Sequence, residues 1–176
     1  MRKPFTLLLV LPFLLASVPQ VNADIWNGPS ITFTRTAFAD WTLPENQDWL
    51  TTNVALTRAQ VMGIFNIAQE NEYSNQSPVD TEWAYGTTAD LGSLTFSTWE
   101  QWHGQNPLTS LNRDAVVHLI SDDIYIDIRF TSWGIGGAGG GAFSYVRSTP
   151  GVIPEPSSGI FVLVVGGFAA LRRRRR

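Results

Sequence analysis

Four acidic residues of the central chain are candidates for acid–base chemistry. Glu45, Asp48, Glu82 and Glu100 could provide the pair of carboxylates that glycoside hydrolysis requires. The separation between the two carboxyl groups decides that chemistry, and a sequence does not give this distance. The alternative is that these acids belong to a solvated surface, which is where most acidic side chains lie. We predict that the protein is not an enzyme.

Three aspartates close together in the sequence raise the question of a calcium site. Asp122 and Asp123 fall in an expected turn and Asp127 in the strand that follows it, and such segments can offer the oxygen ligands that Ca²⁺ prefers. The spacing of an EF-hand loop is missing, however. The alternative is that Asp127 pairs with Arg129 on the same strand face. We expect this ion pair, and we predict neither a metal site nor a cofactor.

The histidines and a glycine-rich run give weaker signals. His103 and His118 lie in different segments, and without a third ligand pattern they predict neither a zinc site nor a catalytic triad. Gly134, Gly136 and Gly139 match the dinucleotide pattern GxGxxG. A dinucleotide loop must open a helix, whereas the residues after this run alternate as a strand. We therefore interpret the run as a connection between strands.

Tryptophan is the most unusual feature of the composition. Exposed tryptophans can stack on sugar rings, and Trp99 and Trp102 have polar neighbours that could hydrogen-bond a sugar. These two and Trp133, which we expect to be the most exposed, are the candidate ligand-binding residues. Aromatic side chains also build the cores of small β domains, and this alternative stays open for each of the seven. They are Trp26, Trp41, Trp49, Trp83, Trp99, Trp102 and Trp133.

An all-β domain over residues 24–149 is expected to position these side chains. Short runs of β-branched and aromatic residues alternate there with Asn, Gly, Pro and Asp. The clearest strand is residues 124–131, in which apolar and polar residues alternate with a period of two. The side chains expected to face the core are Ile124, Ile126, Ile128 and Phe130.

Further strands follow from similar patterns. Residues 115–120 are apolar on both faces, as in an inner strand, and residues 121–123 can turn the chain into a hairpin with residues 124–131. Residues 59–70 are predicted as strand or irregular because Gly63 and Asn66 disfavour a helix. The pattern predicts an antiparallel β-sandwich or jelly-roll-like domain. Its other strands are expected at residues 31–35, 53–57, 94–99 and 143–147.

Composition limits the classes of partner. The 176 residues have a formal net charge of -3, and residues 24–153 hold five arginines against fourteen acids. Such an acidic body repels phosphate backbones, so we predict no binding to nucleic acid. The chain has no cysteine, which excludes disulfides and thiolate chemistry.

The first 23 residues have the pattern of a secretory signal peptide. Arg2 and Lys3 precede an apolar stretch that is too short for an ordinary membrane span, and small residues follow at 21–23. We expect a signal helix that signal peptidase cuts between Ala23 and Asp24. The alternative is a retained membrane anchor.

The end of the chain combines three features. Residues 150–156 form a linker with the sequence Pro154-Glu155-Pro156, and residues 157–171 are uncharged and long enough for a short transmembrane helix. A cluster of cations after this helix would stay on the cytoplasmic side and halt export. These membrane-stop residues are Arg172, Arg173, Arg174, Arg175 and Arg176.

This tail resembles the PEP-CTERM sorting signal of Gram-negative bacteria. The resemblance implies that Pro154, Glu155 and Pro156 are recognised by an exosortase, a membrane transpeptidase that removes the tail. It also implies an association with exopolysaccharide and biofilm. The body is similar to an uncharacterised exported β domain of bacterial surface proteins, through the stretches DTEWAYGTTADLGSLTFSTWEQWHG, AVVHLISDD and DIYIDIRFTSWGIGGAGGGAFSYVRSTP. That second resemblance implies a surface or matrix module without a catalytic motif.

Together these patterns predict an exported protein. Before processing it would be a single-pass inner-membrane protein with its body outside, and afterwards a cell-surface or extracellular protein. The expected role is structural or adhesive. One alternative is a carbohydrate-binding module that uses exposed tryptophans, with or without Ca²⁺, and a further one is a glycoside hydrolase. The expected partners are signal peptidase, exosortase, the membrane and an exopolysaccharide.

Overall fold

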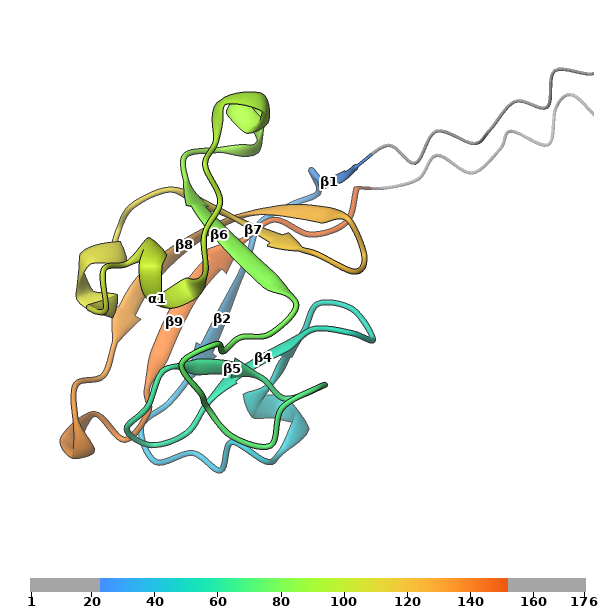
Figure 1. The fold of residues 1–176 in the computed structure, drawn as a ribbon. Coiled ribbons are helices and arrows are strands. Elements are labelled where there is room, and N and C mark those ends of the chain that lie inside the picture. Colours follow the sequence, from blue (N-terminus) through green and yellow to red (C-terminus); the bar gives the residue numbers. More distant parts are fainter. Residues whose placement is uncertain (1–22, 152–176) are drawn as a thin grey trace, which may run out of the picture.

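The computed structural model describes residues 23–151, which form two mainly antiparallel β-sheets and few helical turns (Figure 1). The only α-helix in this range is α1 (Trp99–Trp102), and the 3-10 turns are η1 (Pro44–Asn46), η2 (Thr88–Ser93), η3 (Pro107–Ser110) and η4 (Gly137–Gly139). The strands are β1 (Asp24–Trp26), β2 (Ile31–Arg35), β3 (Asp48–Trp49), β4 (Ala55–Arg58), β5 (Ile64–Asn66), β6 (Thr81–Tyr85), β7 (Ala115–Leu119), β8 (Ile124–Trp133) and β9 (Phe143–Arg147).

The larger sheet is built around the long strand β8. Its order is β2-β9-β8-β7-β6, and β1 pairs in parallel with the first residues of β8. The predicted hairpin is confirmed, because β7 and β8 are antiparallel neighbours on either side of a turn. The predicted alternation is confirmed too, since Ile126, Ile128 and Phe130 are buried whereas Arg129 and Thr131 are exposed. Side chains with a period of two thus give β8 one face toward the core.

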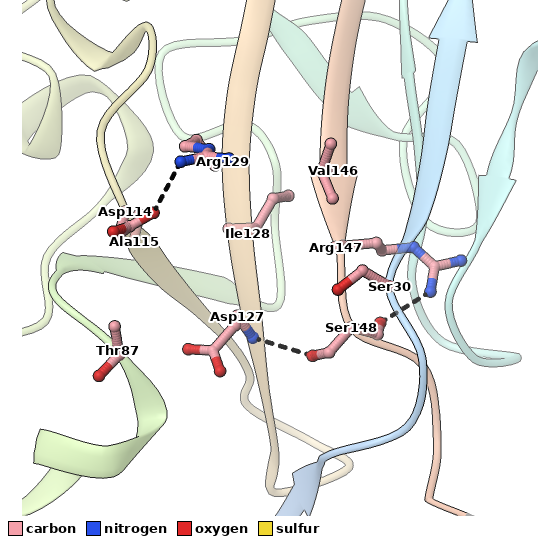
Figure 2. Close-up of a pocket in the computed structure, with 10 residues that line it drawn as sticks. All are labelled: Ser30, Thr87, Asp114, Ala115, Asp127, Ile128, Arg129, Val146, Arg147 and Ser148. Carbon is pink, nitrogen blue, oxygen red and sulfur yellow. Dashed lines mark hydrogen bonds and ion pairs between the residues drawn. The ribbon is translucent and has the colours of Figure 1, made fainter.

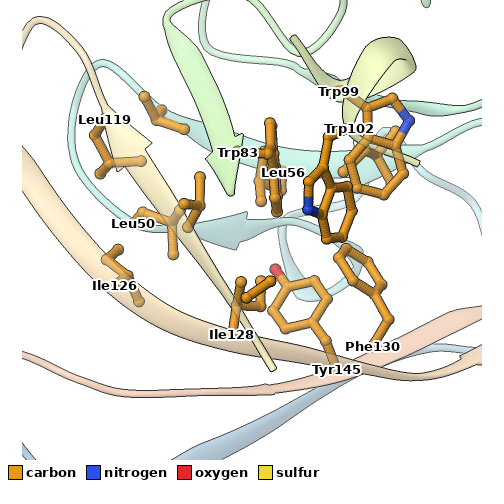
Figure 3. Packing of buried hydrophobic residues seen from close by; sticks show 14 of the residues in the cluster. Leu50, Leu56, Trp83, Trp99, Trp102, Leu119, Ile126, Ile128, Phe130 and Tyr145 are labelled. Carbon is orange, nitrogen blue, oxygen red and sulfur yellow. The ribbon is translucent and has the colours of Figure 1, made fainter. Parts of the chain in front are cut away.

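The smaller sheet has the order β3-β4-β5 and lies below the larger one in Figure 1. The two sheets share one buried cluster (Figure 3), in which aliphatic side chains gather on one side and aromatic rings on the other. Leu50, Leu56 and Ile64 come from the region of the smaller sheet, and Trp83 and Phe130 come from the larger. Burial of this apolar surface is the main term that holds the two sheets together.

A buried ion pair also joins the two sheets. Asp48 of β3 accepts hydrogen bonds from both ends of the Arg147 guanidinium, with Nε···Oδ2 and Nη2···Oδ1 distances of 2.7 Å. The Tyr145 hydroxyl donates to the same carboxylate at 2.7 Å. The three side chains are almost fully buried, so the charges compensate one another away from water. Burial, followed by the negative charge of Asp48, raises the pKa of Tyr145 well above its ordinary value.

Several predicted strands match the structure and one does not. The predictions at residues 31–35 and 143–147 coincide with β2 and β9, and that at 53–57 overlaps β4. The strand predicted at residues 94–99 is wrong, because this segment is irregular and pairs only through Ser97, which exchanges backbone hydrogen bonds with Trp83. The helical turn α1 follows, since residues three apart share one helix face and both ends of α1 are buried.

The glycine-rich run connects β8 to β9, as predicted. Gly134 N donates to Ala142 O at 2.7 Å, which closes the loop around η4. Gly141 has φ +72°, and a Cβ there would overlap the carbonyl oxygen of Ala59. Only glycine combines this left-handed backbone with so close an approach. No helix of the kind that binds pyrophosphate follows, because the chain passes directly into β9.

Several predictions fall on residues outside the described range. They concern the signal helix before Ala23, the sorting motif Pro154-Glu155-Pro156, the helix at 157–171 and the arginines at 172–176. Within residues 23–151, no helix is long and apolar enough to cross a membrane. The two ends of the described chain lie side by side, because Gly28 N donates to Thr149 O at 2.8 Å.

Candidate functional site

A hollow of about 340 Å³ lies at the end of β8, beside Trp133. The segment between β4 and β5, the residues that follow α1 and the glycine-rich loop contribute to its wall. We call it the Trp133 hollow. Its rim is apolar and exposed, with side chains that are between 41% and 66% accessible to solvent: Val61, Met62, Leu108 and Ile135. Exposed apolar side chains that gather around a concavity are typical of a binding site.

Arg58, at the end of β4, lines this hollow although it is only 2% exposed. Its Nε donates to Met62 O at 2.6 Å, and its Nη1 donates to Gly134 O at 3.0 Å and Ala142 O at 2.9 Å. The guanidinium carbon lies 3.8 Å from the centroid of the Trp133 ring, which is a cation–π contact. The backbone carbonyls therefore fix the orientation of the cation.

Among the described residues, no carboxylate forms a hydrogen bond or an ion pair with Arg58. Its positive charge is therefore not balanced by an acid of this part of the chain. Arg35 is a second buried cation, and its guanidinium donates only to carbonyls, including Gly141 O and Ala39 O, each at 2.5 Å. Burial and then the charge of Arg35 lower the pKa of Arg58 to about 10, so Arg58 stays protonated at neutral pH. Burial also lowers the pKa of Arg35, although the charge of Asp40 opposes this shift.

Glu100 of α1 lines the same hollow together with Tyr73. The Tyr73 hydroxyl donates a short hydrogen bond to Glu100 Oε1. Burial, followed by this contact with the carboxylate, raises the pKa of Tyr73, so the phenol stays protonated. His103 Nε2 lies 3.8 Å from the same oxygen, and burial lowers the pKa of His103. A neutral imidazole is therefore the stable form of this buried ring at neutral pH.

Two side-chain amides complete the polar lining. Gln105 and Asn106 follow α1, and both are exposed. Asn106 Oδ1 accepts from Leu108 N at 3.2 Å at the start of η3, so its NH₂ group is the part left to meet a ligand. The left-handed backbone of Gln105, with φ +61°, carries the chain around the edge of the hollow. An apolar rim with a cation, a carboxylate and amides suits an amphipathic ligand.

The prediction for the tryptophans is corrected at two positions. Trp99 and Trp102 are 1% and 8% exposed and pack with Trp83 in the aromatic part of the core, so they cannot serve as exposed platforms (Figure 3). These two side chains pack in the core, which is the alternative that the sequence left open. Trp133 is half-buried and lines the hollow, but Arg58 covers its ring. The most exposed tryptophan is Trp49, at 52%.

A second hollow, of about 280 Å³, lies over β8 and β9 and is shown in Figure 2. Its charged side chains already have partners. Asp127 accepts from Thr88 N at 2.7 Å and from Thr88 Oγ1 at 2.8 Å, and Arg129 lies 3.6 Å from Asp114. The predicted pair of Asp127 with Arg129 is therefore wrong, because each has another partner. No aromatic ring lines this surface.

The aspartates considered for calcium have separate partners. Asp122 accepts from Thr51 Oγ1 at 2.6 Å and Asn53 Nδ2 at 2.8 Å, which ties the β7–β8 turn to the chain before β4. Asp123 Oδ1 lies 3.3 Å from His118 Nε2. Within residues 23–151 there is no group of three or more His, Cys, Asp or Glu placed to hold a metal ion.

The four carboxylates considered for hydrolysis also go to different places. Asp48 is held by Arg147, Glu100 by Tyr73, and Glu82 Oε1 lies 2.7 Å from His118 Nδ1. Glu45 is exposed in η1. Glu100 is the only carboxylate among the described residues that line the Trp133 hollow, so the hollow lacks the acid pair of a glycosidase.

Arg58 and Tyr73 were not singled out from the sequence. A signal for Arg58 does exist, because it ends the run Ala-Leu-Thr-Arg, which the structure buries completely, and only five arginines occur between residues 24 and 153. Tyr73 lies in the loop between β5 and β6, where no periodic pattern gives the direction of a side chain.

Comparisons of the chain with protein-family models, curated proteins and solved structures found no match. The resemblance to PEP-CTERM proteins therefore stays a prediction from the residues of the tail.

Proposed function

We propose that this chain is an exported protein with a structural or adhesive role at the cell surface or in the extracellular matrix. Export would use the signal peptide, with cleavage between Ala23 and Asp24, and sorting would use Pro154-Glu155-Pro156 and an exosortase. The position of the fold supports this proposal. Asp24 is the first residue of β1, and β9 ends at Arg147, so both processing points lie at or beyond the edges of the paired strands. Processing would leave these strands intact.

We further propose that the two sheets form a β-sandwich. Support comes from the shared apolar cluster and from the Asp48–Arg147 ion pair, which bridges β3 and β9. A jelly-roll would need two Greek-key connections between its strands, whereas β7, β8 and β9 are joined as consecutive hairpins. The simpler sandwich therefore fits the described strand order better.

The single observation that carries the adhesive role is the place of the Trp133 hollow. The ends of the described range, residues 23–151, lie near the pairing of β1 with the start of β8, whereas Trp133 is the last residue of β8. Ten strand residues span about 30 Å. A protein held near its C-terminal end would therefore present the exposed rim of the hollow away from its attachment.

A carbohydrate-binding module is the second candidate. It is favoured by the mixed lining of the Trp133 hollow, where apolar side chains stand beside the amides of Gln105 and Asn106 and the carboxylate of Glu100. Sugar rings have apolar C–H faces and polar hydroxyl edges, which such a lining can contact together. This candidate function needs neither a metal nor exposed tryptophans.

The sorting step can be tested by replacing the three residues of the motif. In the variant Pro154→Ala/Glu155→Ala/Pro156→Ala, exosortase would lose its recognition sequence, so the protein is expected to stay in the membrane at the mass of the signal-cleaved precursor. Cell fractionation followed by mass spectrometry measures both properties. The matched control is Pro44→Ala/Glu45→Ala, which changes an exposed Pro-Glu pair in η1 and should be processed normally. Release of the triple variant at the wild-type mass would contradict the sorting proposal.

A further inference from the structure

We propose that the Trp133 hollow binds a uronic-acid residue of a saccharide chain, with Arg58 as the cation that receives its carboxylate. This inference rests on the proposed adhesive function and names the ligand class of the same site. The first support is the unbalanced charge of Arg58. Buried cations in folded proteins are ordinarily paired with an acid, and a ligand carboxylate would supply the acid that the described residues do not.

The geometry leaves one edge of the Arg58 guanidinium for a ligand. Nε and Nη1 are used by the carbonyls of Met62, Gly134 and Ala142, whereas Nη2 donates to no described residue. Nη2 is also not among the buried atoms of residues 23–151 that lack a partner. Nη2 therefore keeps some contact with solvent, although Arg58 as a whole is only 2% exposed, and because Arg58 lines the hollow we place the ligand carboxylate at this donor. The positive charge of Arg35, which acts on Arg58, adds to the attraction for an anion.

The remaining lining distinguishes a carboxylate from a phosphate. The described lining holds a single cation, Arg58, beside the negative charge of Glu100, so the second charge of a phosphate dianion would have no partner there. Tyr73 donates to Glu100 and reduces the repulsion that a singly charged ligand meets. A carboxylate is thus the anion that best fits between Arg58 and Glu100.

The rim and the amides distinguish a sugar from a fatty acid. An alkyl chain would cover the apolar rim, but it would leave the amides of Gln105 and Asn106 without hydrogen bonds. A sugar ring can place C–H groups against Met62 and Leu108 and hydroxyls against the amides. A uronic acid combines this ring with the carboxylate that Arg58 requires.

The test is calorimetric titration of the full-length chain, purified in detergent, at about 0.15 M salt so that the acidic body is screened. The probes are trigalacturonate and its neutral counterpart galactotriose, which carries CH₂OH in place of each carboxylate. We expect trigalacturonate to bind at least tenfold more tightly than galactotriose. Monomeric galacturonate is the third probe, and equal affinity for the monomer would overturn the claim that the uronate belongs to a chain.

Charge variants at the hollow make the test specific. Arg58→Gln should weaken trigalacturonate binding by about tenfold to a hundredfold, because a charge-assisted hydrogen bond is lost. Arg129→Gln is the matched control, since Arg129 lies outside the hollow, is half-exposed and pairs with Asp114. Its affinity for trigalacturonate should equal that of the wild type.

A second pair of variants covers the case in which Arg58→Gln does not fold. Leu108 is 41% exposed on the rim, so substitutions there leave the core unchanged. Leu108→Glu should weaken trigalacturonate binding about tenfold, and Leu108→Lys should strengthen it. The affinity for galactotriose, which is uncharged, should not show these opposite changes. Opposite effects of opposite charges are the result that a general loss of folding would not produce.

Two further outcomes would overturn the inference. Equal binding of trigalacturonate and galactotriose, unaffected by the Leu108 variants, would remove the uronate and leave the hollow as a neutral glycan site, so the adhesive function would stand. Absence of binding to all three probes by folded protein would also overturn it. The adhesive function is then judged separately, by whether the protein is retained in the extracellular matrix.

Discussion

Arg147 and Arg58 are both buried, yet within the described chain only Arg147 faces a carboxylate. The Asp48–Arg147 pair has bidentate geometry and a third partner in Tyr145, which is the arrangement that offsets the cost of removing charge from water. Arg58 has only carbonyl dipoles and a tryptophan ring. We infer that the first arginine serves the fold and the second serves a ligand.

The role of the Asp48–Arg147 pair can be tested by Asp48→Asn. This change leaves the Arg147 cation buried without its counter-charge, and we expect the free energy of unfolding to fall by about 3–5 kcal/mol. Urea denaturation followed by circular dichroism measures it. The control Asp114→Asn breaks an ion pair whose side chains are 51% and 64% exposed, and it should cost less than about 1 kcal/mol. Equal losses in the two variants would show that the buried ion pair contributes no more to the free energy of unfolding than the exposed one.

His103 predicts a pH dependence of stability. Its folded pKa lies below the ordinary 6.5 because of burial, and both ring nitrogens lack a hydrogen-bond partner among the described residues. The unfolded chain therefore binds more protons than the folded chain below pH 6.5. The stability that comes from His103 is present above that pH and is lost as the pH falls toward the lowered pKa.

The variant His103→Phe removes this titration and keeps an aromatic ring against Trp99, whose ring lies 4.6 Å from that of His103. We expect the wild type to lose stability relative to His103→Phe as the pH falls from about 7 to about 5. Unfolding in urea at a series of pH values measures this difference. Both proteins contain His118, so the difference between their free energies of unfolding reports on His103 alone. A difference that stays constant with pH would contradict the assignment of the pH dependence to His103.

At the scale of elements, the loop between β8 and β9 connects the fold to the site. Gly141 O accepts from Arg35, and Gly134 O and Ala142 O accept from Arg58, so this one loop orients both buried cations. The loop can do so because its glycines allow the backbone to approach the arginines closely.

Gly141→Ala tests the importance of this approach. The substitution forces a left-handed backbone on alanine and an overlap with Ala59, so we expect a loss of at least about 2 kcal/mol in the free energy of unfolding. Gly137→Ala is the matched control in the same loop, because a Cβ there meets nothing within 4 Å, and its stability should change by less than about 1 kcal/mol. Chemical denaturation compares the two. Similar stabilities would mean that the loop adjusts to a side chain at residue 141.

Elements with a clear period could be predicted from the sequence, and those fixed by distant contacts could not. Residues 124–131 alternate strictly, and this pattern depends only on the geometry of a strand. Residues 94–99 have a similar composition, but this segment is irregular, and the contact of Trp99 with the aromatic core favours a helical turn that begins at Trp99. Local strand propensity is a weak predictor of secondary structure where large aromatic rings can pack in the core.

The candidate site was less predictable than the fold for the same reason. Trp133, which the sequence predicts to be exposed, is half-buried and lines the hollow. Trp99 and Trp102 have polar neighbours in the sequence, yet a helical turn directs both toward the core. The position of Arg58 depends on the pairing of β3, β4 and β5 and on carbonyl groups of a loop that is distant in the sequence. No short stretch of sequence contains this information.

At the scale of the whole molecule, the long strand β8 separates the ends of the described chain from the Trp133 hollow. Its first residues pair with β1 near both ends of the described chain, and its last residue, Trp133, lies at the hollow (Figure 1). The body is acidic overall, whereas Arg58, the buried charged residue that lines the hollow, is positive. A tethered protein of this form would keep its tether and its ligand at opposite ends.

The most direct test of the adhesive role is retention of the full-length protein in the extracellular matrix of its own host. Leu108→Glu places a charge on the apolar rim of the hollow, whereas Ile120→Glu places the same charge at an exposed apolar residue outside it. Quantitative immunoblotting of matrix and culture fluid should find the Leu108→Glu protein displaced into the fluid and the Ile120→Glu protein retained like the wild type. Equal retention of all three proteins would contradict the claim that the Trp133 hollow is the adhesive contact.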